Sequence, residues 1–582
     1  MNFLKLCVVF FLFVTNKSLA LDITVNIPIY KPLSKSLTTS IPGSSNIILT
    51  KKDLIKYSNS SINEIIDKEA GIKNRSIYGN NSSGSKSTID IRGMGAQAKS
   101  NVLILINGQR LNNIDMSEID FPSIPIESID RIEIFKGNSA TVLYGDGAIG
   151  GAINIITNPE INKTSKNKII YKNGSFNNNE IIWNNNQNYD NYNISTYFNH
   201  TETDGYRDEN EQQQNNFTSE IRFPRSNGDH FIAASFSEQI MSTPSDRSQD
   251  QLYTDRKGSD TPDDFVNSEG GSLLYSSNYQ LKDNLDLVFN SSFRIKDSYS
   301  DLQSTAYPSY SDTTLTNYQL TPRINHISSL FGKNTKSNYG IDIQYADYKS
   351  LRKKNKKAIP LHRYYAWQST QSIYAQQSLE FDKYTKLGLG FRAQRNEIAI
   401  GDILNTNAPD YSGWQTEHET FLDDEINYAL NLGFETKINN NTLIYGRLGN
   451  GFRYPNIDDR IGGSGGTSLN LKTQKSNDLE IGSKFDSENF FSNFSFFVID
   501  SENELAYDSD AFENINVNST RRFGFELKTT KQISKKLIWS NNYTFLKAKY
   551  TSENQGTYAT DFNKNDIPLV PENSLDSILK FN

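Results

Sequence analysis

The pattern of polar and apolar residues changes at about residue 160. From about residue 165 onward, segments of about 8–14 residues alternate polar and apolar positions, with polar stretches between them. Roughly ten alternating residues are what a tilted strand needs to cross the hydrocarbon layer of a membrane. About eighteen segments follow this pattern. They predict a mainly β fold, a transmembrane antiparallel β-barrel over residues 161–582.

The connections between these segments differ in length according to their position. Those after even-numbered segments are short, as at 225–228, 282–284, 439–441 and 486–489. Those after most odd-numbered segments are long, as at 241–270, 400–424 and 453–474. Short turns at one end and long loops at the other are typical of outer-membrane barrels. A soluble sandwich or propeller has no reason to sort its loops in this way.

Residues 44–160 predict a small α+β domain. Short β runs at 89–92, 102–106, 129–135 and 152–156 accompany one helical stretch at 61–69. Residues 21–43, by contrast, show no strong period and contain three prolines, Pro28, Pro32 and Pro42. We expect them to form an extended, mobile arm.

The first twenty residues have the features of a secretory signal peptide. Lys5 precedes an apolar run at 6–14 that is too short to span a bilayer, and small residues permit cleavage after Ala20. The only cysteine, Cys7, lies in this segment. The exported chain is therefore expected to lack disulfides, cysteine metal sites and a cysteine nucleophile.

Composition agrees with an exported barrel. Aromatic residues make up 12% of the chain, including 31 Tyr and 33 Phe. The mean hydropathy of −0.61 does not argue against membrane insertion, because only alternate residues of a barrel strand face lipid. A secreted β-repeat protein such as an adhesin is the alternative on composition. The net charge of −7 disfavours nucleic acid as a partner.

Motifs in both halves of the chain resemble those of TonB-dependent outer-membrane receptors. In the first half they are Ile91-Arg92-Gly93, Val102 to Gly108, Arg131-Ile132-Glu133-Ile134, Lys136-Gly137 and Ala148 to Thr157. In the second half they are Gly451-Phe452-Arg453-Tyr454-Pro455, Asn477 to Gly482 and Arg522 to Glu526. The resemblance implies that residues 44–160 form a plug inside the barrel. It also implies twenty-two strands, so the roughly eighteen that alternation predicts suggest a C-terminal truncation of about four strands.

The resemblance further implies active import into the periplasm. TonB and its inner-membrane energising complex would pair with a TonB box as an added strand and open the plug. The candidate box is Asp22, Ile23, Thr24, Val25 and Asn26; an unstructured mature terminus is the alternative. A ferric siderophore is the leading ligand class, with cobalamin or another metal complex next. A passive porin or surface-binding barrel is the second class of function. No enzyme activity, resident cofactor or metal site is expected.

Two barrel carboxylates are predicted to point into the lumen. Alternation places Leu479 and Ile481 toward lipid and Glu480 inward, and Glu526 is inward by the same argument. Buried carboxylates need cationic partners. The expected partners are Arg92 and Arg131 of the plug, as in the family, because a guanidinium binds carboxylates through parallel hydrogen bonds. We expect these four residues to lock the plug; the alternative is that a wet lumen solvates each charge separately.

Ligand contacts are the feature that the sequence predicts least well. Candidates are Tyr78, Asn80 and Asn81 in the plug, and Tyr307, Tyr310, Tyr365, Trp367 and Trp414 in the barrel. The barrel aromatics are equally consistent with a girdle at the membrane surface. The acidic residues between 246 and 264 are more consistent with a solvated loop than with a Ca²⁺ site. A basic run at 349–357 is more consistent with a solvated loop than with a contact for lipopolysaccharide phosphates or an anionic ferric chelate. Lipopolysaccharide and outer-membrane lipid would surround the barrel.

Overall fold

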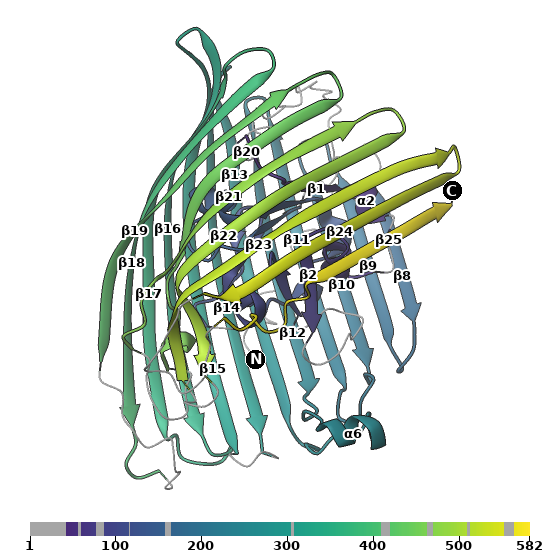
Figure 1. Cartoon of the computed structure of the whole chain (residues 1–582). Helices are drawn as coiled ribbons and strands as arrows, with labels where there is room; N and C mark the ends of the chain where they lie inside the picture. Colours follow the sequence, from purple (N-terminus) through teal and green to yellow (C-terminus); the bar gives the residue numbers. More distant parts are fainter. Residues whose placement is uncertain are drawn as a thin grey trace.

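The computed structural model describes residues 42–55, 57, 60–76, 87–115, 117–157, 165–303, 308–408, 420–461, 469–508, 513–551 and 564–581. Eighteen strands, β8 to β25, form a closed barrel. In Figure 1 the N-terminal domain, in purple, lies within the ring of blue, green and yellow strands. The predicted barrel with an internal plug is thereby confirmed. The ring closes with eighteen strands within the described residues, which differs from the twenty-two that the family resemblance implies.

The barrel strands follow one another around the ring in chain order. Their bounds are β8 Lys166–Asn173, β9 Asn179–Asn188, β10 Asn193–Thr203, β11 Gln212–Arg225, β12 Gly228–Ser242, β13 Phe265–Lys282, β14 Leu285–Leu302, β15 Ser309–Leu330, β16 Lys333–Lys353, β17 His362–Glu380, β18 Thr385–Leu404, β19 Phe421–Lys437, β20 Thr442–Arg453, β21 Gln474–Asp486, β22 Phe490–Asp508, β23 Glu513–Ser534, β24 Leu537–Tyr550 and β25 Asn573–Phe581. Two short helices lie in the connections, α6 Gln249–Thr254 and α7 Ile457–Ile461.

The two ends of the barrel carry different connections. Two residues join β11 to β12, β13 to β14, β15 to β16 and β23 to β24. At the opposite end, the connections after β12, β18, β20 and β24 are much longer. We call this end the long-loop side, and the predicted sorting of loops is confirmed.

Side chains on the strands alternate between lipid and lumen as the sequence pattern predicts. On β21, Leu479 and Ile481 are 36% and 49% exposed, whereas Glu480 between them is fully buried. Exposed Leu430, Leu432 and other apolar residues cover the outside, because only lipid is in contact with that face. The lumen face instead carries the buried charged and amide residues that meet the plug.

The plug is built on a five-stranded sheet with strand order β1-β6-β7-β4-β5. Its strands are β1 Ile47–Thr50, β4 Val102–Ile106, β5 Gln109–Arg110, β6 Ile129–Lys136 and β7 Gly151–Thr157, with a separate hairpin of β2 Ile72–Ser76 and β3 Ser87–Ile91. The short helices are α2 Lys51–Ile55, α3 Ile62–Asp67, α4 Ala98–Asn101, α5 Thr141–Tyr144, η2 Gly95–Gln97, η3 Phe121–Ser123, η4 Ile126–Ser128 and η5 Gly137–Ala140.

The core of the plug explains why its strands could be read from the sequence. Ile132, Ile134, Ile153 and Ile155 are completely buried, as expected for central strands covered on both faces. The predicted helix forms as α3, where the side chain of Glu64 accepts a hydrogen bond from the Ser61 amide at 2.9 Å. Within the described residues, no helix is long and apolar enough to cross a membrane.

Candidate functional site

The turn after β3 brings Arg92 of the plug to the barrel wall. Arg92 has a φ of 58° and is followed by Gly93 with a φ of 75°. A left-handed conformation is unfavourable for an arginine and persists only where surrounding contacts enforce it. One such contact is the hydrogen bond that the Arg92 amide donates to the Gly71 carbonyl at 2.9 Å. The strained turn therefore aims the guanidinium at the barrel.

The Arg92 side chain is completely buried between two barrel carboxylates. Its Nη1 donates to Glu480 Oε2 at 3.0 Å, and its Nε donates to Glu526 Oε1 at 3.0 Å. Its Nη2 donates to the hydroxyl of Ser45 at 3.2 Å. Burial lowers the pKa of Arg92, but the two carboxylates raise it by more, so the guanidinium remains charged.

Further charges complete what we call the central charge cluster: Arg92, Lys136, Arg447, Asp478, Glu480 and Glu526. Lys136 Nζ of the plug lies 2.6 Å from Glu526 Oε2. Arg447 forms an ion pair with Asp478 and lies 3.7 Å from Glu480. Three cations thus face three carboxylates in a buried interface, the arrangement that offsets the cost of burying each charge.

Arg131 lies outside this cluster, which corrects the expectation for that residue. Its guanidinium pairs with Asp130 at 3.1 Å and Glu133 at 2.8 Å, within the plug. Arg131 precedes Lys136 by five positions on β6, which is about 16 Å along a strand. Lys136 takes the role that was expected of Arg131, because its ammonium pairs with Glu526. Residues 132–136 of β6 are all buried, so the alternation of the strand does not single out Lys136.

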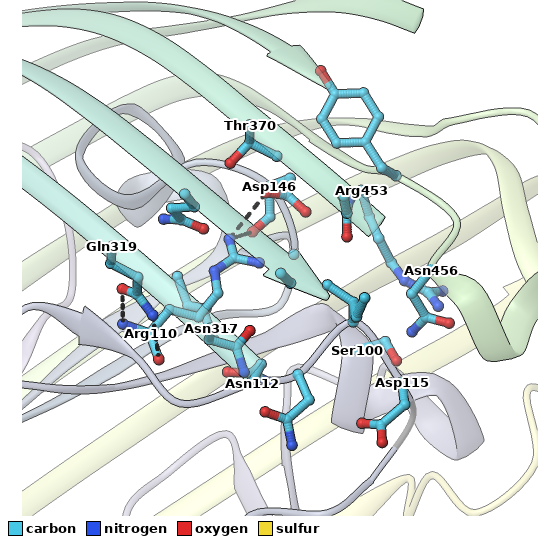
Figure 2. Close-up of a pocket in the computed structure, with 18 of the residues that line it drawn as sticks. Ser100, Arg110, Asn112, Asp115, Asp146, Asn317, Gln319, Thr370, Arg453 and Asn456 are labelled. Atoms are coloured by element: carbon cyan, nitrogen blue, oxygen red, sulfur yellow. Dashed lines mark hydrogen bonds and ion pairs between the residues drawn. The ribbon is translucent and has the colours of Figure 1, made fainter. Parts of the chain in front are cut away.

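A second feature of the interface is a pocket that we call the long-loop pocket. It lies between the plug and strands β15, β16 and β17, and its remaining wall is the segment that follows β20 (Figure 2). Plug residues in its lining are Lys99, Ser100, Leu103, Arg110, Asn112, Asn113, Ile114, Asp115, Ser117, Asp146 and Gly147. Barrel residues are Asn317, Tyr318, Gln319, Gln344, Tyr345, Ala346, Gln368, Thr370, Arg453, Tyr454 and Asn456.

Arg110 organises the plug side of this pocket. Figure 2 shows its guanidinium directed at Asp146, where Nη2 lies 3.0 Å from a carboxylate oxygen. The Gln319 side chain binds both polar groups of the Arg110 backbone, accepting from the amide at 3.0 Å and donating to the carbonyl at 2.9 Å. The barrel strand thereby holds the plug strand β5 at the pocket wall.

The segment after β20 reaches into the lumen and touches the plug. The Ile457 amide at the start of α7 donates to the Ile114 carbonyl at 2.9 Å. Ile457 also belongs to an apolar cluster with Tyr348 and Ile398 of the barrel wall, against which Ile114 packs. Arg453 at the end of β20 is ion-paired with Asp459 of α7 at 2.5 Å. These contacts fix the pocket wall opposite Arg110.

Most predicted ligand residues lie elsewhere. The candidate box 22–26 and Tyr78, Asn80, Asn81, Tyr307 and Trp414 lie outside the described residues. Tyr310 is buried under the Lys353 ammonium, and Tyr365 and Trp367 lie on the outward face of β17, alternating with buried Tyr364 and Ala366. None of the three lines the long-loop pocket. The outward position of Tyr365 and Trp367 on β17 corrects the expected ligand contact and matches the alternative of an aromatic girdle.

The acidic loop carries its own counter-charge. Arg247 lies 2.6 Å from Asp255 and 3.0 Å from Asp260. In the part of the chain that the structure describes, no group of three or more His, Cys, Asp or Glu side chains is arranged to hold a metal ion.

Comparisons with known proteins agree with this geometry. Residues 137–581 match the family described as TonB dependent receptor-like, beta-barrel, and residues 38–152 match the TonB-dependent Receptor Plug Domain. The ferric citrate transporter FecA in its unliganded form shares the fold with a TM-score of 0.76 at 13% identity, over 93% of this chain and 85% of that chain. The siderophore receptor PiuA from Acinetobacter baumannii gives 0.73 at 16% identity, over 96% and 86%. The copper transporter OprC gives 0.76 at 14% identity, over 93% and 84%.

Proposed function

Because the chain belongs to the TonB-dependent receptor family of outer-membrane transporters, we propose that it actively imports a scarce metal chelate, with ferric siderophores as the leading class. Cobalamin or another metal complex is the nearest alternative. The proposal for iron is supported by the ferric citrate and siderophore receptors among the similar structures. The similar copper transporter is the reason to include other metals in any test.

The observation that carries the proposal is the occupied lumen. A plug with its own buried core is attached to the barrel wall by a cluster of buried charges. Such an interior argues against free diffusion, because a porin keeps a water-filled channel. A solute that crosses this barrel needs the plug to move, and movement against several buried ion pairs requires work.

We assign this work to two parts of the protein. The central charge cluster is a reversible lock, with Arg92 and Lys136 on the moving side and Glu480 and Glu526 on the fixed side. Residues 22–26 are the TonB box through which force is applied. Strand addition suits this role, because backbone hydrogen bonds grip a segment with little demand on its side chains.

The test is uptake by cells that express the full-length protein in the absence of other receptors. Radiolabelled ferric siderophores, cobalamin and a copper chelate are supplied separately, with and without a protonophore. We expect one ligand to accumulate, and the protonophore to stop accumulation while surface binding persists. Entry of several small solutes at rates that ignore the protonophore would identify a diffusive pore and end the proposal.

A further inference from the structure

The long-loop pocket is walled mainly by uncharged polar side chains. Amides and a hydroxyl come from four separate parts of the fold: Asn112 from the plug, Asn317 from β15, Gln368 and Thr370 from β17, and Asn456 after β20. Figure 2 shows Asn112, Asn317, Thr370 and Asn456 gathered around the same space. Amide groups both donate and accept hydrogen bonds, so this lining can recognise a polar ligand without charge.

The cations of the pocket are already paired with carboxylates. The three pairs are Arg110 with Asp146 at 3.0 Å, Arg453 with Asp459 at 2.5 Å, and Lys99 with Glu118 at 3.7 Å. The carboxylate of Asp115 adds a further negative charge to the lining, and the partly buried Arg294 lies near it. Four cations therefore meet four carboxylates. A polyanionic ligand would have to displace these internal partners or approach them at close range, both of which oppose binding.

Three buried N–H donors of the lining have no acceptor within the described part of the chain. They are Nδ2 of Asn317, Nη1 of Arg453 and Nε of Arg110. Asn317 and Arg453 are only 8% and 2% exposed, so bulk water reaches them poorly. A buried donor without a partner is unfavourable, and a ligand oxygen placed in the pocket removes that penalty.

From the balanced charges and the unpaired donors, we propose that the long-loop pocket binds an uncharged ligand rich in oxygen acceptors. Within the proposed function, on which this inference rests, that ligand class is a neutral ferric chelate such as a ferric trihydroxamate. Its carbonyl and hydroxamate oxygens match the N–H donors of Asn317, Arg453 and the neighbouring amides. Trianionic ferric tricatecholates and ferric citrate are the classes that the pocket disfavours.

The test is equilibrium binding to the purified full-length protein, followed by tyrosine and tryptophan fluorescence. The probes are a ferric trihydroxamate, a ferric tricatecholate and ferric citrate, each at low and high salt. We expect the neutral chelate to bind at least about tenfold more tightly than either anion, with little dependence on salt. Asn317→Leu should weaken its binding by about 3–10-fold, since one hydrogen bond is lost.

A matched control lies on the same strand. Asn325 is a similarly buried, inward-facing asparagine of β15 that does not line the pocket, so Asn325→Leu should leave binding unchanged. Asp146→Asn frees Arg110 from its counter-charge and should shift the preference toward the anionic chelates by about tenfold.

The outcomes separate this inference from the proposed function. Tighter, salt-sensitive binding of an anionic chelate overturns the inference and leaves iron import intact. Equal binding of the neutral chelate by Asn317→Leu and Asn325→Leu overturns the inference in the same way. If no ferric chelate binds and cobalamin does, both the inference and the proposal for iron are overturned.

Discussion

Replacing Arg92 by alanine should loosen the plug from the barrel without affecting the barrel itself. The change removes three hydrogen bonds, to Glu480, Glu526 and Ser45, from a side chain that is fully buried. Glu480 retains the Ser45 amide at 3.0 Å and the Arg447 guanidinium at 3.7 Å, and Glu526 retains Lys136. Removal of one partner from a buried ion pair costs about 3–5 kcal/mol, because the other charge stays buried.

Hydrogen exchange of the plug amides, read by mass spectrometry, measures this cost directly. A loss of about 3–5 kcal/mol corresponds to roughly two to four orders of magnitude less protection in β6 and β7. The matched control is Arg521→Ala. Arg521 also pairs with a carboxylate, Asp500, but both side chains are about half exposed on the outer face of the barrel. Such a pair contributes about 0–1 kcal/mol, so protection should hardly change.

A combined variant distinguishes loss of charge balance from loss of packing. Arg92→Met with Glu480→Gln removes one buried charge of each sign and leaves Lys136 paired with Glu526, so it should recover much of the protection that Arg92→Ala loses. Equal protection in Arg92→Ala and Arg521→Ala would refute the lock. So would a double variant that is less protected than Arg92→Ala alone.

Further predictions concern neighbouring residues. In the same exchange measurement, Lys136→Ala should weaken plug protection by an amount close to that of Arg92→Ala, whereas Arg131→Ala should have little effect, because its partners belong to the plug. Gly71→Ala should lower the thermal unfolding temperature of the plug, since a Cβ at this position, with φ at +78°, would lie 2.1 Å from Glu526 Oε1. Tyr365→Ala should leave chelate affinity unchanged within about twofold in a binding titration, because the side chain points outward.

Features set by local sequence are predictable from the chain alone. The direction of Glu480 follows from its apolar neighbours, since a strand alternates faces whatever lies beyond it. The alternation of short turns and long loops is likewise predictable, because each connection depends only on the two strands that it joins. The ion pair between Lys136 and Glu526 is of another kind, because it joins residues 390 positions apart and depends on how the whole plug sits in the barrel. The motif around Arg131 points to that residue, and only packing excludes it.

The candidate ligand residues illustrate the same limit. The sequence offers Tyr365 as a candidate ligand contact, but β17 begins at His362 and carries Tyr365 to the outer face. The long-loop pocket draws on the plug, three barrel strands and the segment after β20. No spacing in the sequence links Asn112, Asn317 and Asn456, so the pocket can be found only in three dimensions.

Energy coupling through the candidate TonB box is tested most directly by uptake in a deletion of residues 22–26, compared with the full-length protein. Labelled ferric chelate is measured twice in each strain, as surface binding at low temperature and as accumulation at growth temperature. We expect normal surface binding and no accumulation in the deletion. A deletion in residues 30–34 of the same arm serves as the length-matched control and should still accumulate the chelate. Undiminished accumulation without residues 22–26 would contradict energy coupling through this segment.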